Sequence, residues 1–401
     1  MYDLAFQYKG TKLWQQLYDD ELFAVRLSDG EIGYCCVMGM IGQHNALGLY
    51  VGDEGYQSYQ LLRSADQDDM TDQRMGELVT SQDCLQCSFE TRDMLSDAEL
   101  QEVRRYAETH GRTLRGKNAF PQFTKYRPGR FPWHFDSELD GQRICDALAA
   151  AVALKKLLHK TGKEDLGLCS VDEEPERIPM LVFADGQWVM RDTPLPAAGM
   201  RYPEPALAND VTAARIRRKA KAGVWECGTL RLPNPVQEEG HEGEAPYYPL
   251  VLIFIELENE LVQHPILTNG EDPAEMVNEF AEHLVTRKTV PRVIRCGDDR
   301  CYALLKNLCA RTGIALERTD ELEALEAVTE DFLDHMSDFQ DEELEPDEIE
   351  EMFDVLMQTP DSELRQMPQE LVDMLYSLAE AGELPAPLEQ RVRKLFRRKQ
   401  K

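Results

Sequence analysis

The stretch Leu250–Leu257, with the sequence LVLIFIEL, decides the fold of the second half of this chain. Its first six residues, Leu250–Ile255, are all apolar. A strand with one face in water alternates apolar and polar side chains, whereas a strand covered on both faces is apolar throughout. The stretch therefore predicts a central β-strand with other parts of the fold packed on both of its faces.

Apolar runs and helical periods on both sides of this strand predict a series of further elements. In chain order these are strands Val224–Leu232, Leu250–Leu257 and Leu261–Leu267, a helix at 272–287, strand Val293–Cys296, helix Arg300–Arg311, strand Ile314–Leu316 and helix Asp320–His335. The order β-β-β-α-β-α-β-α is that of ribonuclease-H-like folds. We therefore expect an α/β domain with ribonuclease-H-like element order over residues 178–336.

Ribonuclease-H-like folds that are catalytic hold two metal ions between four groups of carboxylates, on the first strand, the first helix, the end of the fourth strand and the last helix. Acidic residues at the equivalent positions are Glu226, Glu275 or Glu279, Asp298 or Asp299, and Asp331 or Asp334. Chance alone can fill such positions, because 74 of the 401 residues are acidic, and Glu226 stands where an Asp is usual. We expect a non-catalytic domain with no metal or cofactor, and a metal-dependent nuclease is the alternative.

Three cysteines of this domain have a predictable arrangement. Cys227 lies on the first predicted strand, and Cys296 and Cys301 lie at and just after the fourth. If these strands are neighbours, the three side chains lie close together. We expect buried thiols there, because unpaired cysteine behaves as a small apolar residue.

The N-terminal part predicts a second domain, an α+β domain over residues 1–160. Strand-like runs occur at Leu22–Leu27, Ile32–Met38, Ala46–Val51 and Cys84–Phe89. Ser96 and Glu99 form a capping-box pattern at the start of one helix, and Asp136 or Ser137 starts a longer helix through His159. Residues 160–177 are expected to be a linker, and a hairpin of Ile178–Phe183 and Gln187–Met190 is expected to open the second domain.

The segment between those two helices, residues 109–135, has an unusual composition, and we call it the basic aromatic loop. It contains no Asp or Glu, although about five would be expected from the composition of the chain. Its cations alternate with aromatic rings and prolines, a combination that suits an anionic or stackable ligand. The candidate binding residues are Arg112, Arg115, Lys117, Lys125, Tyr126, Arg127, Arg130, Trp133 and His134.

The same composition is also typical of a packed structural loop. Rings and prolines can fill gaps between elements while Lys and Arg stems cover them and leave their charges in water. Charge reversal of Arg127 and Arg130 separates the two interpretations. If the loop binds a ligand, reversal is expected to abolish binding and leave the fold intact, because exposed charges contribute little to stability.

Several short motifs carry a resemblance to known proteins. They are Gly116-Lys117, Pro121-x-Phe123, Arg127-Pro128-Gly129-x-x-Pro132-Trp133, Met38-Gly39-x-x-Gly42 and Leu49-Tyr50-x-Gly52-x-x-Gly55. With these motifs the chain resembles a group of bacterial proteins catalogued only as domains of unknown function. The resemblance covers most of residues 10–335 and implies two adjacent domains in a bacterial cytosolic protein. It brings no catalytic residues.

Composition excludes several classes of protein. The formal net charge of −30 keeps the chain in solution and repels nucleic acid from most of its surface. No signal-peptide pattern begins the chain, and no apolar run reaches the roughly 18 residues of a membrane span. The ten cysteines are scattered rather than spaced as a disulfide framework, which fits a cytoplasmic protein.

The C-terminal part, residues 338–401, predicts an acidic helical appendage with a basic tail. The tail either binds an external partner or folds back on the acidic helices. Taken together, the sequence predicts two mixed-sheet α/β domains with this appendage. We expect a non-enzymatic binding or adaptor protein, with a protein partner or an anionic ligand at residues 109–135.

Overall fold

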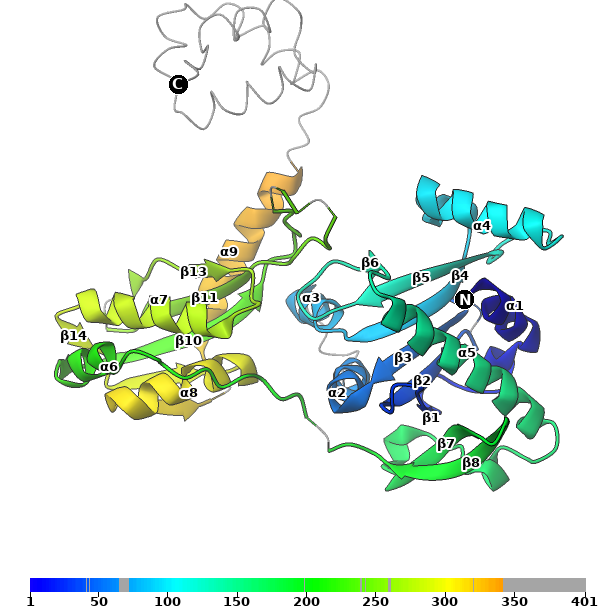
Figure 1. Ribbon diagram of the computed structural model, residues 1–401. Helices are drawn as coiled ribbons and strands as arrows, with labels where there is room; N and C mark the ends of the chain where they lie inside the picture. The colour runs from blue at the N-terminus through cyan, green and yellow to red at the C-terminus, as the bar shows by residue number, and fades with distance from the viewer. Residues whose placement is uncertain are drawn as a thin grey trace, which may run out of the picture. The chain divides into compact units, whose positions relative to one another are not determined.

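The computed structural model of this chain (Figure 1) describes residues 1–341, with gaps at 41, 43, 65–71, 198, 239, 242, 259–260 and 320. Side chains are not described at 72–74, 261–262 and 334–341. Residues Met1–Glu326 form one compact unit, and Ala327 begins a second one. From residue 342 on, the predicted appendage and basic tail lie outside the described residues.

The first part of the chain forms an eight-stranded sheet in the order β6-β5-β4-β3-β2-β1-β7-β8. Neighbouring strands are antiparallel except for the parallel pair β1 and β7. The strands are β1 (Phe23–Arg26), β2 (Ile32–Met38), β3 (Ala46–Val51), β4 (Cys84–Glu90), β5 (Phe120–Tyr126), β6 (Trp133–His134), β7 (Arg177–Ala184) and β8 (Gln187–Pro194).

Helices cover both faces of this sheet. They are α1 (Tyr2–Thr11), α2 (Gly52–Arg63), α3 (Asp72–Thr80), α4 (Asp97–Thr109) and α5 (Glu138–Leu158), with single 3-10 turns at Leu13–Gln15, Arg92–Met94, Glu164–Leu166 and Val171–Glu173. On one face, Leu47 and Leu49 of β3 share a core with Leu148 of α5, which lies along the sheet (Figure 1). On the other face, Tyr50 of β3 packs against Tyr59 of α2, with ring centroids 5.2 Å apart.

The start of α4 confirms a local prediction. The Ser96 hydroxyl accepts a hydrogen bond from the Glu99 amide at 3.4 Å, and the Glu99 carboxylate accepts one from the Ser96 amide at 2.9 Å. Two backbone donors that the helix leaves unpaired are satisfied in this way. The basic aromatic loop therefore starts from a well-defined helix and, as expected, ends at another.

The second sheet has the order β12-β11-β10-β15-β16, and β13 also pairs with β11. Strand β10 is antiparallel to β11 and parallel to β15, which in turn is parallel to β16. A separate parallel pair joins β9 and β14. The strands are β9 (Ala220–Lys221), β10 (Val224–Arg231), β11 (Leu250–Glu256), β12 (Leu261–Val262), β13 (Ile266–Thr268), β14 (Thr289–Val290), β15 (Val293–Cys296) and β16 (Ala315–Arg318).

The central strand is as predicted, and so is the element order apart from the additional short strands β9 and β14. No side chain of Leu250–Ile255 in β11 is more than 5% exposed. The helices that alternate with the strands are α6 (Asp210–Arg217), α7 (Pro273–Thr286), α8 (Asp299–Thr312) and α9 (Glu323–Asp341). The predicted strand Leu261–Leu267 is divided into β12 and β13, because Pro265 between them has no amide to donate to a ladder.

The hairpin β7–β8 corrects one prediction. It was expected to open the second domain, but β7 pairs with β1 of the first sheet, with Ala24 opposite Met180 and Val25 opposite Leu181. The side chains of Met180 and Leu181 are buried in the two cores of that sheet. Residues 160–177, expected to be a linker between domains, instead return the chain to β1, and the Val171 amide donates to the Asp20 carbonyl at 2.9 Å.

None of the described helices is long and apolar enough to cross a membrane.

Candidate functional site

The basic aromatic loop contains two strands that the sequence did not predict. Residues Phe120–Tyr126 form β5, which pairs with β4 along its whole length, and Trp133–His134 form β6. Phe123 is buried in the same core of the first sheet as Leu47 and Leu148. Pro121 within β5 obscures the strand pattern, because proline lacks the amide that a ladder uses.

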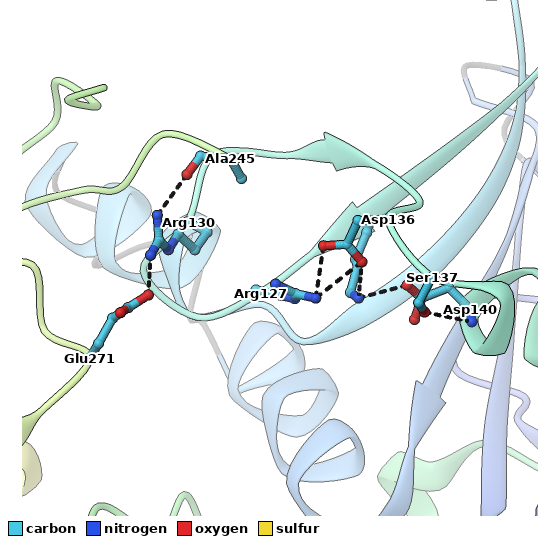
Figure 2. A network of polar contacts seen from close by, with 8 residues as sticks. Arg127, Arg130, Asp136, Ser137, Asp140, Ala245 and Glu271 are labelled. Atoms are coloured by element: carbon cyan, nitrogen blue, oxygen red, sulfur yellow. Dashed lines mark hydrogen bonds and ion pairs between the residues drawn. The ribbon is translucent and has the colours of Figure 1, made fainter. Parts of the chain in front are cut away.

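Lys125 and Arg127 at the end of β5 are paired with Asp136, which precedes α5, and with Asp140 in its first turn. Figure 2 shows the pair of Arg127 with Asp136. The Lys125 ammonium lies 2.8 Å from Asp136 and 2.7 Å from the Asp140 carboxylate, which is only 5% exposed. The Arg127 guanidinium lies 2.9 Å from Asp136. Burial raises the pKa of Asp136, but its hydrogen bond with Lys125 and the charges of Arg127 and Lys125 hold that pKa below the usual range. The counter-charges of these two cations thus come from acids that directly follow the loop in the chain.

Arg130 at the tip of the loop is bound to a distant segment of the same compact unit. Its guanidinium donates to the Ala245 carbonyl at 2.7 Å and pairs with Glu271 (Figure 2). The backbone continues this contact, since Tyr248 donates to Gly129 at 2.9 Å and Phe131 donates to the Pro246 carbonyl at 2.8 Å. Only 18% of the Arg130 side chain is exposed, so it is not the solvent-facing cation that the sequence predicted.

Gly129 explains part of the Arg127-Pro128-Gly129 motif. Its φ of +77° lies in the left-handed region, and a Cβ there would lie 2.5 Å from the guanidinium of Arg231. The Gly129 amide donates to the Thr80 carbonyl at 2.7 Å. Only glycine fits this turn without displacing Arg231. The loop tip therefore has a structural role that requires this residue.

Arg112 near the start of the loop belongs to a stack of rings that the sequence analysis missed. Its guanidinium lies 4.7 Å from the centre of the Phe6 ring and 3.6 Å from Asp3. The Phe6 ring stacks on Tyr106 at 5.9 Å, and Tyr106 stacks on His110 at 4.1 Å. Phe6 and Tyr106 lie outside residues 109–135, so the composition of that segment gives no sign of them.

Arg115 and Lys117 remain exposed and have no ion pair or hydrogen bond with any residue in the described part of the chain. Arg104 and Arg105 on the outer side of α4 are exposed in the same way, again with no partner for their side chains among the described residues. We use the name free basic surface for these four residues, which are grouped by their exposure and by the lack of a partner in the described chain. Arg115 and Lys117 belong to the predicted site, whereas Arg104 and Arg105 were not predicted.

The three remaining candidates differ in exposure. Tyr126 packs against the buried cluster that contains Tyr50 and Tyr59. Burial, followed by the charges of nearby Cys84 and Glu90, raises the pKa of Tyr126 to about 12. Trp133 is partly buried, its ring lies 5.1 Å from His134, and its indole nitrogen has no hydrogen-bond partner among the described residues. His134 is exposed.

Two polar cavities lie beside the loop. One, of about 380 Å³, is lined by Asp83, Arg127, Pro128, Gly129, Arg130, Asn269, Gly270 and Glu271. The other, of about 250 Å³, is lined by Leu49, Val51, Glu54, Asp83, Cys84, Leu85, Lys125, Tyr126, Asp140 and Arg143. Asp83 lines both, and burial followed by the charge of Glu54 raises its pKa.

Two of the carboxylates expected at the nuclease positions, Glu226 and Asp298, accept hydrogen bonds from the first turns of helices. Glu226 is 5% exposed and accepts the Leu325 amide of the first turn of α9 at 3.0 Å. Asp298 accepts the Cys301 amide at 2.6 Å, the Thr229 amide at 3.0 Å and the Thr229 hydroxyl at 2.8 Å. Within residues 1–341, apart from the gaps, no three His, Cys, Asp or Glu side chains are placed to hold a metal ion.

The cysteine prediction is confirmed. Strands β10 and β15 are neighbours with Cys227 opposite Cys296, and the Cys301 sulfur lies 3.4 Å from that of Cys296. All three are buried thiols. Burial and the neighbouring sulfurs raise the pKa of Cys227 and of Cys301 well above the ordinary value, which favours the neutral thiol.

Comparisons with known proteins place two family models on the chain. Residues 1–168 match the model described as Domain of unknown function (DUF7309), and residues 212–333 match Domain of unknown function (DUF6930). The chain is thus similar to two adjacent domains of unknown function, as its motifs indicated. No curated protein matches the chain.

One solved structure has a weak similarity to this chain. It is described as the simian T-cell lymphotropic virus intasome in complex with PP2A regulatory subunit B56 gamma. The sequence identity is 12% and the TM-score 0.22, over 37% of this chain and half of the other. A similarity of this size supports no conclusion about fold or function.

Proposed function

We propose that this protein is a non-enzymatic binding or adaptor protein that holds an acidic segment of another protein on its free basic surface. The observation that carries the proposal is the state of Arg104, Arg105, Arg115 and Lys117. Each is exposed and has no ion pair with the described residues, in a chain whose net charge is −30. These cations are available to a partner without breaking an existing ion pair.

The other cations of the basic aromatic loop offer less to a ligand. Lys125, Arg127 and Arg130 already have carboxylate partners at ion-pair distance. An external anion would have to displace those carboxylates and would gain only the difference between two similar interactions. For this reason the proposed contact surface is limited to the start of the loop and the end of α4.

An acidic protein segment fits this surface better than nucleic acid. A long polyanion would extend beyond four cations onto a strongly negative surface, whereas a short acidic segment needs only a local match of charge. The stacked rings of Tyr106 and His110 lie in the same stretch of chain as the four cations. They provide apolar area next to the charges, as is usual at protein interfaces.

Part of the proposal concerns the second sheet, which we take to be a ribonuclease-H-like domain that has no nuclease activity. The element order and the placement of β10 between antiparallel β11 and parallel β15 support this assignment. The capping roles of Glu226 and Asp298 support the lack of activity, because Glu226 already accepts an amide of α9 and Asp298 an amide of α8. The proposed location is the bacterial cytoplasm, supported by ten cysteines that are all free thiols.

Binding of a fluorescein-labelled polyglutamate peptide, measured by fluorescence anisotropy, tests the proposal. The double variant Arg115→Glu and Lys117→Glu should weaken binding at least about tenfold, and binding by the native protein should fall as salt is raised. The matched control is Arg217→Glu with Arg218→Glu, two exposed cations on and just after α6 that change the net charge by the same amount. Equal loss in both double variants, or no binding by the native protein, would contradict the proposal.

A mass-spectrometric survey then seeks the natural partner. Proteins that co-purify with the native chain and not with the Arg115 and Lys117 variant are the candidates.

The alternative function, a metal-dependent nuclease, is tested by incubating the protein with Mg²⁺ or Mn²⁺ and single- or double-stranded nucleic acid. Cleavage that disappears in Glu226→Gln and Asp298→Asn would establish a nuclease instead.

A further inference from the structure

Strand β8 forms one edge of the first sheet, and its outer side meets no other strand in the described part of the chain. It pairs with β7 over its whole length of 8 residues, from Gln187 opposite Ala184 to Pro194 opposite Arg177. The strand at the other edge of the sheet, β6, has only 2 residues. A long edge strand presents a row of backbone amides and carbonyls that pair readily with a further strand. The first sheet therefore has room for a partner strand beside β8.

The turn between β7 and β8 determines which backbone groups pair within the hairpin. Asp185 and Gly186 have φ values of +51° and +77°, as a two-residue type I′ turn requires. In this turn the flanking residues, Ala184 and Gln187, form a hydrogen-bonded pair. Along the hairpin such pairs alternate with pairs that exchange no hydrogen bond. Every second residue of β8, counted from Gln187, is thus bonded to β7.

The residues between them direct their backbone groups outward, away from β7. These residues are Trp188, Met190 and Asp192. Just beyond the hairpin the Leu195 amide donates to the Glu176 carbonyl at 3.3 Å, so position 195 continues the series that is bonded inward. The Arg177 guanidinium donates to the Asp192 carbonyl at 2.9 Å, and a carbonyl oxygen has a second lone pair for another donor. The outward positions of β8 are therefore open to a partner strand.

Apolar side chains lie together at this edge and are incompletely covered. Trp188 and Met190 pack against the core that contains Leu148 of α5, yet both remain partly exposed. Phe183 of β7, whose ring lies 5.3 Å from that of Trp188, is 58% exposed. Apolar side chains that are grouped at a surface, rather than scattered singly, are typical of a protein interface.

The charge of the edge favours a second copy of this chain as the partner. Strand β8 carries one cation and one anion, Arg191 and Asp192, and is locally neutral in a chain whose net charge is −30. Two such edges therefore approach each other without the direct repulsion that acts between strongly acidic surfaces. A peptide of high net charge finds no matching patch of charge on this strand.

We propose that β8 pairs antiparallel with β8 of a second copy of this chain, around a two-fold axis at Met190, and that the two sheets become continuous in the dimer. A two-fold axis perpendicular to the sheet places one residue opposite itself, and that residue must have outward backbone groups. Met190 lies midway between the outward residues Trp188 and Asp192. An axis at Trp188 would place Met190 opposite Gly186 of the turn, and an axis at Asp192 would bring two carboxylates together.

The side chains agree with this register. The two Met190 side chains meet at the axis and cover each other. Trp188 and Asp192 are equally far from Met190 along the strand, so each indole, a hydrogen-bond donor, lies opposite a carboxylate of the second copy. On the other face Arg191 lies opposite Val189 and not opposite itself. The inference goes beyond the proposed function, because no residue of the free basic surface lies on β8.

Sedimentation equilibrium of the full chain tests the inference first. The native chain should form a dimer with a Kd of about 50 µM or lower, as expected of a small interface. Because each copy has a net charge of −30, the dimer should become tighter as KCl is raised. Binding of polyglutamate to the free basic surface should weaken over the same range, so the two proposals fail separately. A native chain that is monomeric at about 200 µM would overturn the inference.

Opposite charges introduced at position 190 test the position of the axis. Met190→Lys should weaken the dimer at least about tenfold, because the axis brings the two ammonium groups together, and Met190→Glu should do the same. An equimolar mixture of the two variants should restore the dimer, since each ammonium then faces a carboxylate. The matched control is Val211→Lys on α6, where the native side chain is 67% exposed, and it should dimerise as the native chain does. A mixture that stays monomeric, or undiminished dimerisation of Met190→Lys, would contradict the inference.

Disulfide cross-linking tests the register without a charge in the strand. Residues opposite each other in a hydrogen-bonded pair have Cα atoms about 5.5 Å apart, a distance that a disulfide spans. Met190→Cys should therefore give a covalent dimer with the oxidant diamide. Arg191→Cys should give no more than the native chain with its ten cysteines, because the two copies of position 191 would be more than about 7 Å apart. Equal cross-linking of the two variants, or none in Met190→Cys, would overturn the proposed pairing.

Discussion

Gly129 and Arg231 are in direct contact, and the contact depends on the absence of a side chain at position 129. A Cβ there would lie 2.5 Å from Cζ and from both terminal nitrogens of Arg231, at a φ of +77°. The loop tip that the sequence offered as a binding surface is therefore fitted to its own chain. Substitutions at Gly129 and at nearby residues measure how much these contacts contribute to stability.

Gly129→Ala should destabilise the protein by about 2 kcal/mol or more, because the substitution adds left-handed strain and a clash with a partly buried guanidinium. Gly186→Ala is a close control, since Gly186 also has a φ of +77° but has no atom within 4 Å of the added Cβ. Urea denaturation of both variants separates the free-energy cost of the clash with Arg231 from the cost of the left-handed backbone. Equal losses would mean that the contact with Arg231 costs nothing.

Arg130→Ala should lower the stability of the protein by about 1–2 kcal/mol, since it removes the hydrogen bond to Ala245 and the pair with Glu271. Lys117→Ala, which removes an exposed cation with no partner in the described chain, should change stability by less than about 0.5 kcal/mol. Denaturant titrations give both values. If the two variants prove equally stable, Arg130 does not hold the loop tip in place.

Asp140→Asn should cost about 3 kcal/mol, because it leaves the ammonium of Lys125 in a largely buried position with a weaker set of partners. Asp136→Asn removes the more exposed carboxylate of the same group and should cost less than about 1 kcal/mol. Chemical denaturation at neutral pH compares them. The reverse order of the two losses would contradict the assignment of Asp140 as the principal partner.

Asp83→Asn should raise the Tm at pH 7. Burial and the charge of Glu54 raise the pKa of Asp83, so the folded state favours the protonated carboxyl. The contribution of this group to stability is largest below its ordinary pKa of 3.8 and falls as the pH rises through the raised value. The advantage of the Asn variant should therefore be present at neutral pH and vanish below pH 3.8. A Tm scan over pH checks this sign, and Asp29→Asn, which breaks a 2.8 Å pair with Arg143, should instead lower the Tm at pH 7.

Parts of the fold could be predicted because their signals are local. Leu250–Ile255 is apolar at every position, and the strand that it forms is buried on both faces. The Ser96 and Glu99 cap requires only two residues three positions apart, and it is present. Such features depend on the nearest neighbours in the chain, which the sequence displays directly.

Other features depend on partners far away in the chain. The Asp185-Gly186 turn predicts a hairpin, but nothing in that turn indicates that its first strand pairs with β1. The lack of acids in residues 109–135 is visible in the sequence, whereas the carboxylates that pair with Lys125 and Arg130 come from α5 and from Glu271. Which of the candidate cations have a carboxylate partner and which do not therefore depends on the fold. The sequence alone does not show it.

The parallel pairing of β1 with β7 also determines when the first sheet can be completed during synthesis. Ala24 of β1 lies opposite Tyr34 of β2 on one side and opposite Met180 of β7 on the other, so β1 keeps one open edge until the hairpin β7–β8 has left the ribosome. A polypeptide that stops at residue 168, where the first family match ends, would retain the core of α5 and lack those last two strands. An unpaired strand edge is a template for association between chains. The first part of this protein is therefore expected to aggregate more readily when it ends at residue 168 than when its chain extends through Pro194.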